Sequence, residues 1–152
     1  MSLVLTTPLS EQANVGQLIH GKVSGNVRYM DRILIPNGAV VVGRVRRLER
    51  YSQSEDYFIV ALEFSEMQAG ASRLRFYADL QSLDPTPAIE LFLSNSSRDS
   101  RDLGHRGLPV VTTNEQIRLP DLPGVGSFFI RGGRFSLPTG FRMVWKTREL
   151  SR

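Results

Sequence analysis

The sequence predicts an all-β protein built as a single antiparallel β-barrel, with a β-sandwich as the alternative. Several segments alternate apolar and polar residues at the two-residue period of a half-buried strand. No stretch of about 11 residues or more combines the 3.6-residue period of a helix with helix caps. Turn residues separate the segments at short intervals, so we expect about eight or nine strands. A barrel or a sandwich hides the edges of so many short strands.

A motif that occurs twice organises this prediction. RILIPNGAVVVGR spans residues 32–44, and RFSLPTGFRMVWK spans residues 134–146, 102 positions later. Proline fixes φ and glycine permits positive φ, so Pro36-Asn37-Gly38 and Pro138-Thr139-Gly140 are predicted to be structural turns. We expect each copy to form a hairpin of strand, tight turn and strand.

The first third of the chain contains strand candidates at 17–23, 32–35 and 39–48. Ser24-Gly25-Asn26 is a turn signal between the first two. Residues 9–15 are expected to make one short helical turn.

The centre and the end of the chain supply the other strands. In 72–80, Leu74, Phe76, Ala78 and Leu80 point to one face, and 58–65 alternates likewise, so the two segments are predicted to form a hairpin across 67–71. Strands are also expected at 89–93, 127–131, 134–137 and 141–147. In the last of these, Phe141, Met143 and Trp145 share one face and are expected to pack inward.

Residues 94–126 interrupt the strand pattern with a long polar segment. We expect an exposed excursion within a single domain that spans 1–152, with a short strand at 108–112. Long loops are often functional, and Asp121, Leu122, Pro123 and Gly124 are our candidate for a partner-facing loop. A disordered insertion is the alternative.

Composition excludes several classes of protein. With 41% apolar and 22% charged residues, the chain is typical of a globular protein, and no apolar run approaches the roughly 18 residues of a membrane span. The absence of cysteine excludes disulfides and thiolate ligands. The net charge is +4, and the cations are almost all arginine.

Two clusters carry alternative functions. One cluster consists of arginines on strands expected to be neighbours, and these are possible contacts for a polyanion: Arg44, Arg46, Arg73 and Arg75. The acidic residues between them and the modest net charge argue against binding of nucleic acid. Glu63 with Glu66, or Asp79 with Asp84, are possible acid/base pairs of an enzyme. His20 and His105 lack zinc-ligand spacing, and we expect no metal, no cofactor and no catalytic residue.

The segment 5–45 resembles a known family. PLSEQANVGQLIHGKVSGNV followed by DRILIPNGAVVVGRV is similar to a β-domain of exported bacterial envelope proteins of the acidobacterial type, and distantly to the C-terminal periplasmic barrel of TrbI-like conjugation and type IV secretion proteins. The resemblance implies a β-barrel domain outside the cytoplasm, with no catalytic residues to carry over.

We therefore expect a non-enzymatic structural or protein-interaction module of the cell envelope, with a protein partner or self-association. The first residues lack the basic and apolar regions of a signal peptide, which fits either a cytoplasmic protein or the mature part of an exported one. Because of the resemblance, we expect the exported, periplasmic protein, with a cytoplasmic protein as the alternative.

Overall fold

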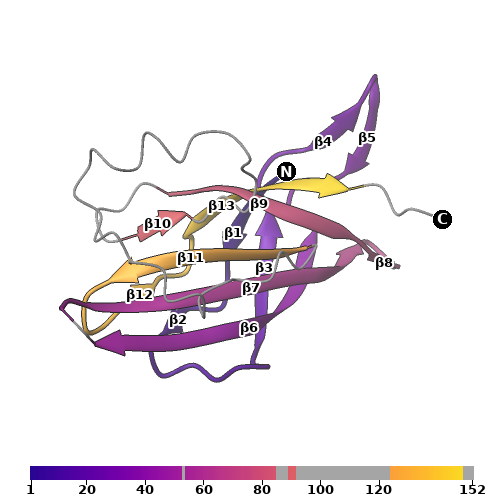
Figure 1. Cartoon of the computed structure of the whole chain (residues 1–152). Coiled ribbons are helices and arrows are strands. Elements are labelled where there is room, and N and C mark those ends of the chain that lie inside the picture. The colour runs from indigo at the N-terminus through magenta and orange to yellow at the C-terminus, as the bar shows by residue number, and fades with distance from the viewer. Residues whose placement is uncertain (53, 85–88, 92–123, 149–152) are drawn as a thin grey trace.

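Nine strands form one strongly curled antiparallel sheet in the computed structural model, which describes residues 1–52, 54–84, 89–91 and 124–148 (Figure 1). These strands are β1 (Ser2–Leu5), β3 (Leu18–Val23), β6 (Val40–Ser52), β7 (Asp56–Ala69), β8 (Ser72–Arg75), β9 (Tyr77–Leu83), β10 (Ile89–Leu91), β11 (Val125–Arg131) and β13 (Arg142–Arg148). Their order across the sheet is β10-β11-β7-β6-β3-β1-β13-β9, and β8 pairs with β7. The prediction of an all-β, barrel-like fold is confirmed.

Two smaller sheets have two strands each. β2 (Leu9–Ser10) pairs with β12 (Ser136–Leu137), and β4 (Val27–Tyr29) pairs with β5 (Arg32–Ile35). The helical turn expected at 9–15 is wrong, because β2 occupies its start and the Ala13 N–H donates to the Ser10 carbonyl in a single tight turn. No helix long and apolar enough to cross a membrane occurs among the residues that the structure describes.

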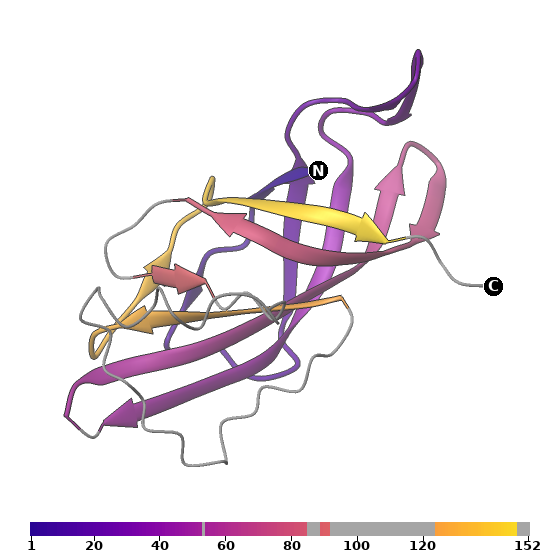
Figure 2. The ribbon, with the colours of Figure 1, turned by 45° about the horizontal axis from the view of Figure 1, so that its top comes forward.

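The curl of the sheet can be followed from β7, one edge of which pairs with two different strands in turn (Figure 2). One edge pairs with β6. The other pairs first with β11, opposite residues 57–63, and then with β8, opposite residues 66–69. After Phe76, whose N–H donates to the Ser65 carbonyl, the chain continues from β8 into β9, which pairs with β13. The strand order therefore leads back to β7 around one apolar core.

Side chains from all sides of the curl fill this core. Those with the least exposure are Leu3, Leu5, Ile19, Val41, Val45, Val60, Leu62, Phe64, Ala78, Phe128, Leu137, Met143 and Trp145. Phe141, Met143 and Trp145 are buried together, as expected. Leu74 is 50% exposed and does not join them, because it lies in β8, where the hairpin with β7 extends beyond the core.

The two copies of the repeated motif have the same turn geometry. Gly38 has a φ of 82° and Gly140 a φ of 91°. The residue after each glycine donates its N–H to the proline carbonyl three positions earlier, at 3.2 Å for Ala39 and 3.1 Å for Phe141. Each glycine N–H also donates to a carbonyl of another strand, that of Val23 at 2.8 Å and that of Leu5 at 2.7 Å.

The hairpins expected around these turns are wrong. β5 pairs with β4 and β6 pairs with β3, while β12 pairs with β2 and β13 pairs with β1 and β9. Because each glycine bonds to a third strand, each turn is a corner that carries the chain from a small sheet into the large one. The two arms of each motif are therefore in different sheets.

Other strand bounds differ in detail from the predictions. β6 continues to Ser52, and its pairing with β7 has two register irregularities. β1 and β4 have no counterpart among the predicted strands. β11 begins at Val125, so the end of the expected excursion is strand rather than loop. The strand expected at 108–112, and most of the excursion, lie outside the described residues.

Candidate functional site

The β4–β5 hairpin, residues 27–35, projects away from the main sheet (Figures 1 and 2). We refer to it as the projecting hairpin. Four of its apolar side chains are exposed: Tyr29 by 63%, Met30 by 82%, Ile33 by 48% and Leu34 by 56%. Exposed apolar side chains gathered on one element are typical of a surface that contacts another molecule.

The base of the projecting hairpin is held by the body of the protein. Val27 pairs with Ile35, and both pack against the core. Below them, Asn37 Oδ1 accepts the Gly25 N–H at 2.8 Å, and Asn26 Oδ1 accepts the Asn37 N–H at 2.8 Å. Asn37 of the first motif therefore fixes the two ends of the hairpin to each other, which fixes the direction in which the hairpin leaves the sheet.

The tip of the hairpin is a two-residue turn, Met30-Asp31, between the paired residues Tyr29 and Arg32. Met30 has a φ of 52°, and it is the only residue other than glycine with a positive φ in the described part of the chain. This conformation costs a side-chain-bearing residue about 1 kcal/mol, and glycine is preferred in such turns. Burial of the side chain does not offset this cost, because Met30 is 82% exposed.

The hairpin also has open edges. β4 and β5 pair only with each other among the described strands. An isolated two-stranded hairpin is marginally stable in water, and its outer backbone N–H and C=O groups can pair with a strand of another chain. Side-chain and backbone groups of the hairpin are thus both available for contact.

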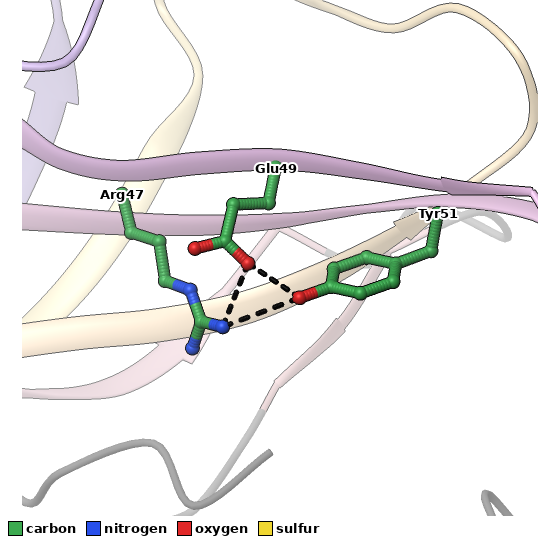
Figure 3. A network of polar contacts seen from close by, with 3 residues as sticks. All are labelled: Arg47, Glu49 and Tyr51. Carbon is green, nitrogen blue, oxygen red and sulfur yellow. Dashed lines mark hydrogen bonds and ion pairs between the residues drawn. The ribbon is translucent and has the colours of Figure 1, made fainter. Parts of the chain in front are cut away.

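A second surface lies on the outer face of the sheet, where Arg47, Glu49 and Tyr51 alternate along β6 (Figure 3). Arg47 Nη2 is 2.7 Å from Glu49 Oε2, and the Tyr51 hydroxyl donates to the same oxygen. The Arg47 hydrogen bond is the main reason why the pKa of Glu49 is lowered. The hydrogen bond to Glu49 in turn raises the pKa of Tyr51.

Aromatic rings extend this surface across β7 to β11. Tyr51 stacks on Tyr57 with ring centroids 5.1 Å apart, and Tyr57 meets Phe129 edge-on at 5.6 Å. Ile59 and Ala61, on the same face of β7, are buried. Arg47 and Glu49 neutralise each other's charge, and the Tyr51 hydroxyl is hydrogen-bonded to both. The polar groups of these three side chains therefore bond to one another, and we assign them a stabilising role rather than a reactive one.

The four arginines considered for polyanion binding do not form one stripe. The expectation of neighbouring strands is wrong, since β7 lies between β6 and β8. Arg46 Nε is 3.3 Å from Glu63 Oε2, and Arg44 donates to the Gly16 carbonyl. In the register of β8, Arg75 lies opposite Glu66, and Arg73 lies opposite Gln68. Carboxylates of β7 therefore separate the two arginine pairs.

Asp79 and Asp84, considered as one of the acid/base pairs, have structural contacts. Asp79 accepts the Gly124 N–H at 3.4 Å and forms an ion pair with Arg148. Asp84 Oδ2 accepts the Arg142 N–H at 2.8 Å. Each of these aspartates therefore joins the end of one strand to another strand.

His20 is exposed beside Thr7, with its backbone N–H donating to Thr7 Oγ1 at 3.1 Å. No group of three or more His, Asp or Glu side chains is placed to hold a metal ion in the parts of the chain that the structure describes. His105 lies outside those parts.

Of the four residues proposed as a partner loop, only Gly124 is among the described residues, and it is buried next to Tyr77. Its φ is 82°, and its N–H bonds to Asp79, so it is a turn that starts β11. Asp121, Leu122 and Pro123 lie outside the described residues.

Comparison with known proteins found no match: no protein family, no curated protein and no solved structure is similar to this chain at a significant level. The resemblance of residues 5–45 to an envelope domain therefore stays a prediction.

Sequence reasoning misses the projecting hairpin as a site. The apolar run Ile33-Leu34-Ile35 is what a buried strand would show, so the pattern predicts that 32–35 contributes to the main sheet. One signal is available: the residues that form the turn, Met30 and Asp31, include no glycine or asparagine, although a tight hairpin turn favours them.

Proposed function

We propose that this chain is a non-catalytic protein-interaction module of the bacterial cell envelope and that the projecting hairpin is its contact element. The observation that carries the proposal is Met30, an apolar residue that is 82% exposed in a backbone conformation with a φ of 52°. Strained residues persist where function requires them. Contact with a partner would bury Met30 and its neighbour Tyr29, and aromatic residues and methionine are enriched in protein interfaces.

The chemistry of the hairpin favours a protein over a lipid surface. Asp31 is next to Met30 in the turn, so a tip that entered a bilayer would take a carboxylate with it. The open strand edges, in contrast, suit a polypeptide partner, whose backbone can add hydrogen bonds to them. The envelope location rests on the resemblance of residues 5–45.

Site-specific photo-cross-linking in bacteria that carry the chain tests the contact element. A photoreactive residue is placed at Met30 and, as the control, at Val15, which is 63% exposed and lies outside the hairpin. We expect a discrete cross-linked product from the first position and none from the second. Equal labelling from the two positions would contradict the proposal. Fractionation of the same cells tests the location separately, and recovery in the cytoplasm would overturn the envelope assignment alone.

A further inference from the structure

We propose that the partner of the projecting hairpin is an acidic polypeptide segment, whose carboxylates pair with Arg28 and Arg32. This inference rests on the proposed function, because it names the chemistry of the partner that the same contact element binds. It follows from the exposed cations of the hairpin, from their positions on its two faces, and from the open edges of its strands.

The two arginines of the hairpin have no acidic partner of their own. Both are exposed, and neither forms an ion pair with any residue that the structure describes. Asp31, the one carboxylate of the hairpin, lies in the turn and pairs with neither. On the body of the protein, in contrast, several arginines lie against carboxylates: Arg46 with Glu63, Arg47 with Glu49, Arg50 with Asp56 and Arg148 with Asp79.

The register of the hairpin places one arginine on each face. Tyr29 pairs with Arg32, and Arg28 pairs with Ile33. Paired residues lie on the same face with their β-carbons about 5 Å apart, and adjacent residues of a strand lie on opposite faces. One face therefore presents Arg32 beside Tyr29, and the other presents Arg28 beside Ile33. Arginine and tyrosine are among the residues that contribute most to binding at protein interfaces.

A strand added to an open edge of the hairpin would meet both faces. β4 and β5 have no further partner among the described strands, and the side chains of an added strand would point alternately to the two faces. Guanidinium groups bind carboxylates through two parallel hydrogen bonds, which favours an acidic partner over a neutral one. The arrangement therefore fits an extended segment that brings a carboxylate and an apolar side chain to each face.

The base of the hairpin adds a third cation. Lys22 is exposed on the outer face of β3, shortly before the turn that leads into β4. Its cross-strand neighbours are Val4 of β1 and Val40 of β6, so no carboxylate lies directly opposite it. The positive charge therefore continues from the hairpin toward the sheet, which disfavours a basic partner.

Fluorescence anisotropy of a labelled peptide, titrated with the whole chain, tests the inference. The probe consists of repeats of Glu-Glu-Val-Val, which as a strand carries alternating Glu and Val on each face. At about 10 mM salt, where exposed charges interact over roughly 30 Å, we expect binding that weakens as the salt concentration rises. A peptide of the same length with Lys in place of Glu should not bind.

Charge removal at two places locates the contact. Arg28→Gln together with Arg32→Gln should weaken binding of the Glu peptide about 5-fold or more, the effect of losing two exposed ion pairs. The matched control, Arg44→Gln together with Arg134→Gln, removes the same charge from exposed arginines outside the hairpin. These two also form no ion pair within the described part of the chain, and their loss should weaken binding much less. Thermal unfolding shows that each variant is folded.

The inference would be overturned if no binding of the Glu peptide is seen up to about 1 mM chain, if the Lys peptide binds equally, or if the control variant weakens binding as much as the hairpin variant. Oligothymidylate with the same number of charges tests for nucleic acid. Binding as tight as that of the peptide would overturn a polypeptide partner.

These failures can be told apart from failure of the proposed function. If the chain does not prefer the acidic peptide while Met30 still cross-links to another protein in cells, the contact element stands and its partner is not acidic. If the peptide binds through Arg28 and Arg32 but Met30 gives no product in cells, the proposed function is wrong and the preference for acidic segments remains.

Discussion

Gly126 of β11 lies so close to Leu80 of β9 that a β-carbon on the glycine would be 2.4 Å from the Leu80 Cβ. The same β-carbon would be 2.8 Å from the Trp145 Cη2 atom. β11 and β9 are near opposite ends of the strand order, and they come together here because the sheet curls. The missing side chain thus allows the curl to close over the core.

Gly126→Ala should lower the free energy of unfolding by about 2 kcal/mol, the usual cost of adding a group to a packed core. Leu80 and Trp145 are both buried, and the Leu80 atom nearest to the added group is its Cβ, which cannot move without the backbone. Neither neighbour can therefore make room by a change of rotamer. Urea denaturation followed by the fluorescence of Trp145, the single tryptophan, measures the change. Gly133→Ala is the control, because its nearest neighbour is the flexible Asp56 carboxylate at 3.2 Å. Equal stability of the two variants would contradict the closure at Gly126.

Substitutions at Gly38 should lower stability through backbone strain alone, without a steric clash. Its φ is 82°, and a β-carbon added to this glycine would have no neighbour within 4 Å, so Gly38→Ala introduces strain but no clash. We expect a loss of about 1 kcal/mol, and less for Gly38→Asn, since asparagine tolerates positive φ. Gly38→Val should cost more than Gly38→Ala, because a β-branched residue is least suited to this conformation. Thermal melting measures all three, and an unchanged midpoint for Gly38→Val would reject the corner.

The sequence predicts the fold class and most strands because alternation reports burial of one face. It places Phe141, Met143 and Trp145 in the core for this reason. It also identifies both Pro-x-Gly turns, whose backbone requirement is local. Apart from the hairpin of β7 and β8, it does not predict which strands pair, since the hydrogen-bond partners of Gly38 and Gly140 lie on strands distant in sequence.

The candidate site is beyond sequence reasoning for a related reason. Ile33 and Leu34 are as apolar as core residues, and only the three-dimensional arrangement shows that they stay 48% and 56% exposed. The prediction that the four arginines lie on neighbouring strands is wrong for a similar reason. Arg44 and Arg75 lie on strands that pair with opposite edges of β7, and a local sequence pattern does not show the order of strands in the sheet.

The Arg47–Glu49–Tyr51 network should make stability depend on acid pH. The pKa of Glu49 is lowered in the folded protein, so its contribution is present above the unfolded value near 4.5 and is lost as the pH falls through the folded value. Glu49→Gln should flatten the decline of the melting temperature below pH 4.5, by an amount worth less than about 1 kcal/mol, because the pair is partly exposed. Glu55→Gln removes an exposed carboxylate outside the network, and an equal effect there would contradict this role.

Tyr51 should report the same network in alkaline solution. Its hydroxyl donates to the Glu49 carboxylate, which raises the pKa of Tyr51 above the usual 10. The stabilisation is therefore present below pH 10 and is lost as the pH rises through the raised value. In an ultraviolet titration of the four tyrosines, Tyr51→Phe should remove a step above pH 10, and Glu49→Gln should move that step toward pH 10. If Glu49→Gln titrates like the parent protein, or if the step that Tyr51→Phe removes lies at the usual pH rather than above it, the hydrogen bond is absent in solution.

Met30→Gly should separate the stability of the projecting hairpin from its function. Glycine adopts the φ of 52° without a steric penalty, so the variant should be as stable as the parent or more stable by about 0.5–1 kcal/mol. Most surface substitutions have smaller effects. The same variant removes the most exposed apolar side chain of the tip, so cross-linking from a photoreactive residue at Tyr29 should fall. Met30→Asn is the second test, because asparagine keeps a side chain in this conformation without restoring apolar surface. A loss of stability in both variants would show that Met30 serves the fold, whereas a gain of stability together with a loss of contact is what a strained interaction element predicts.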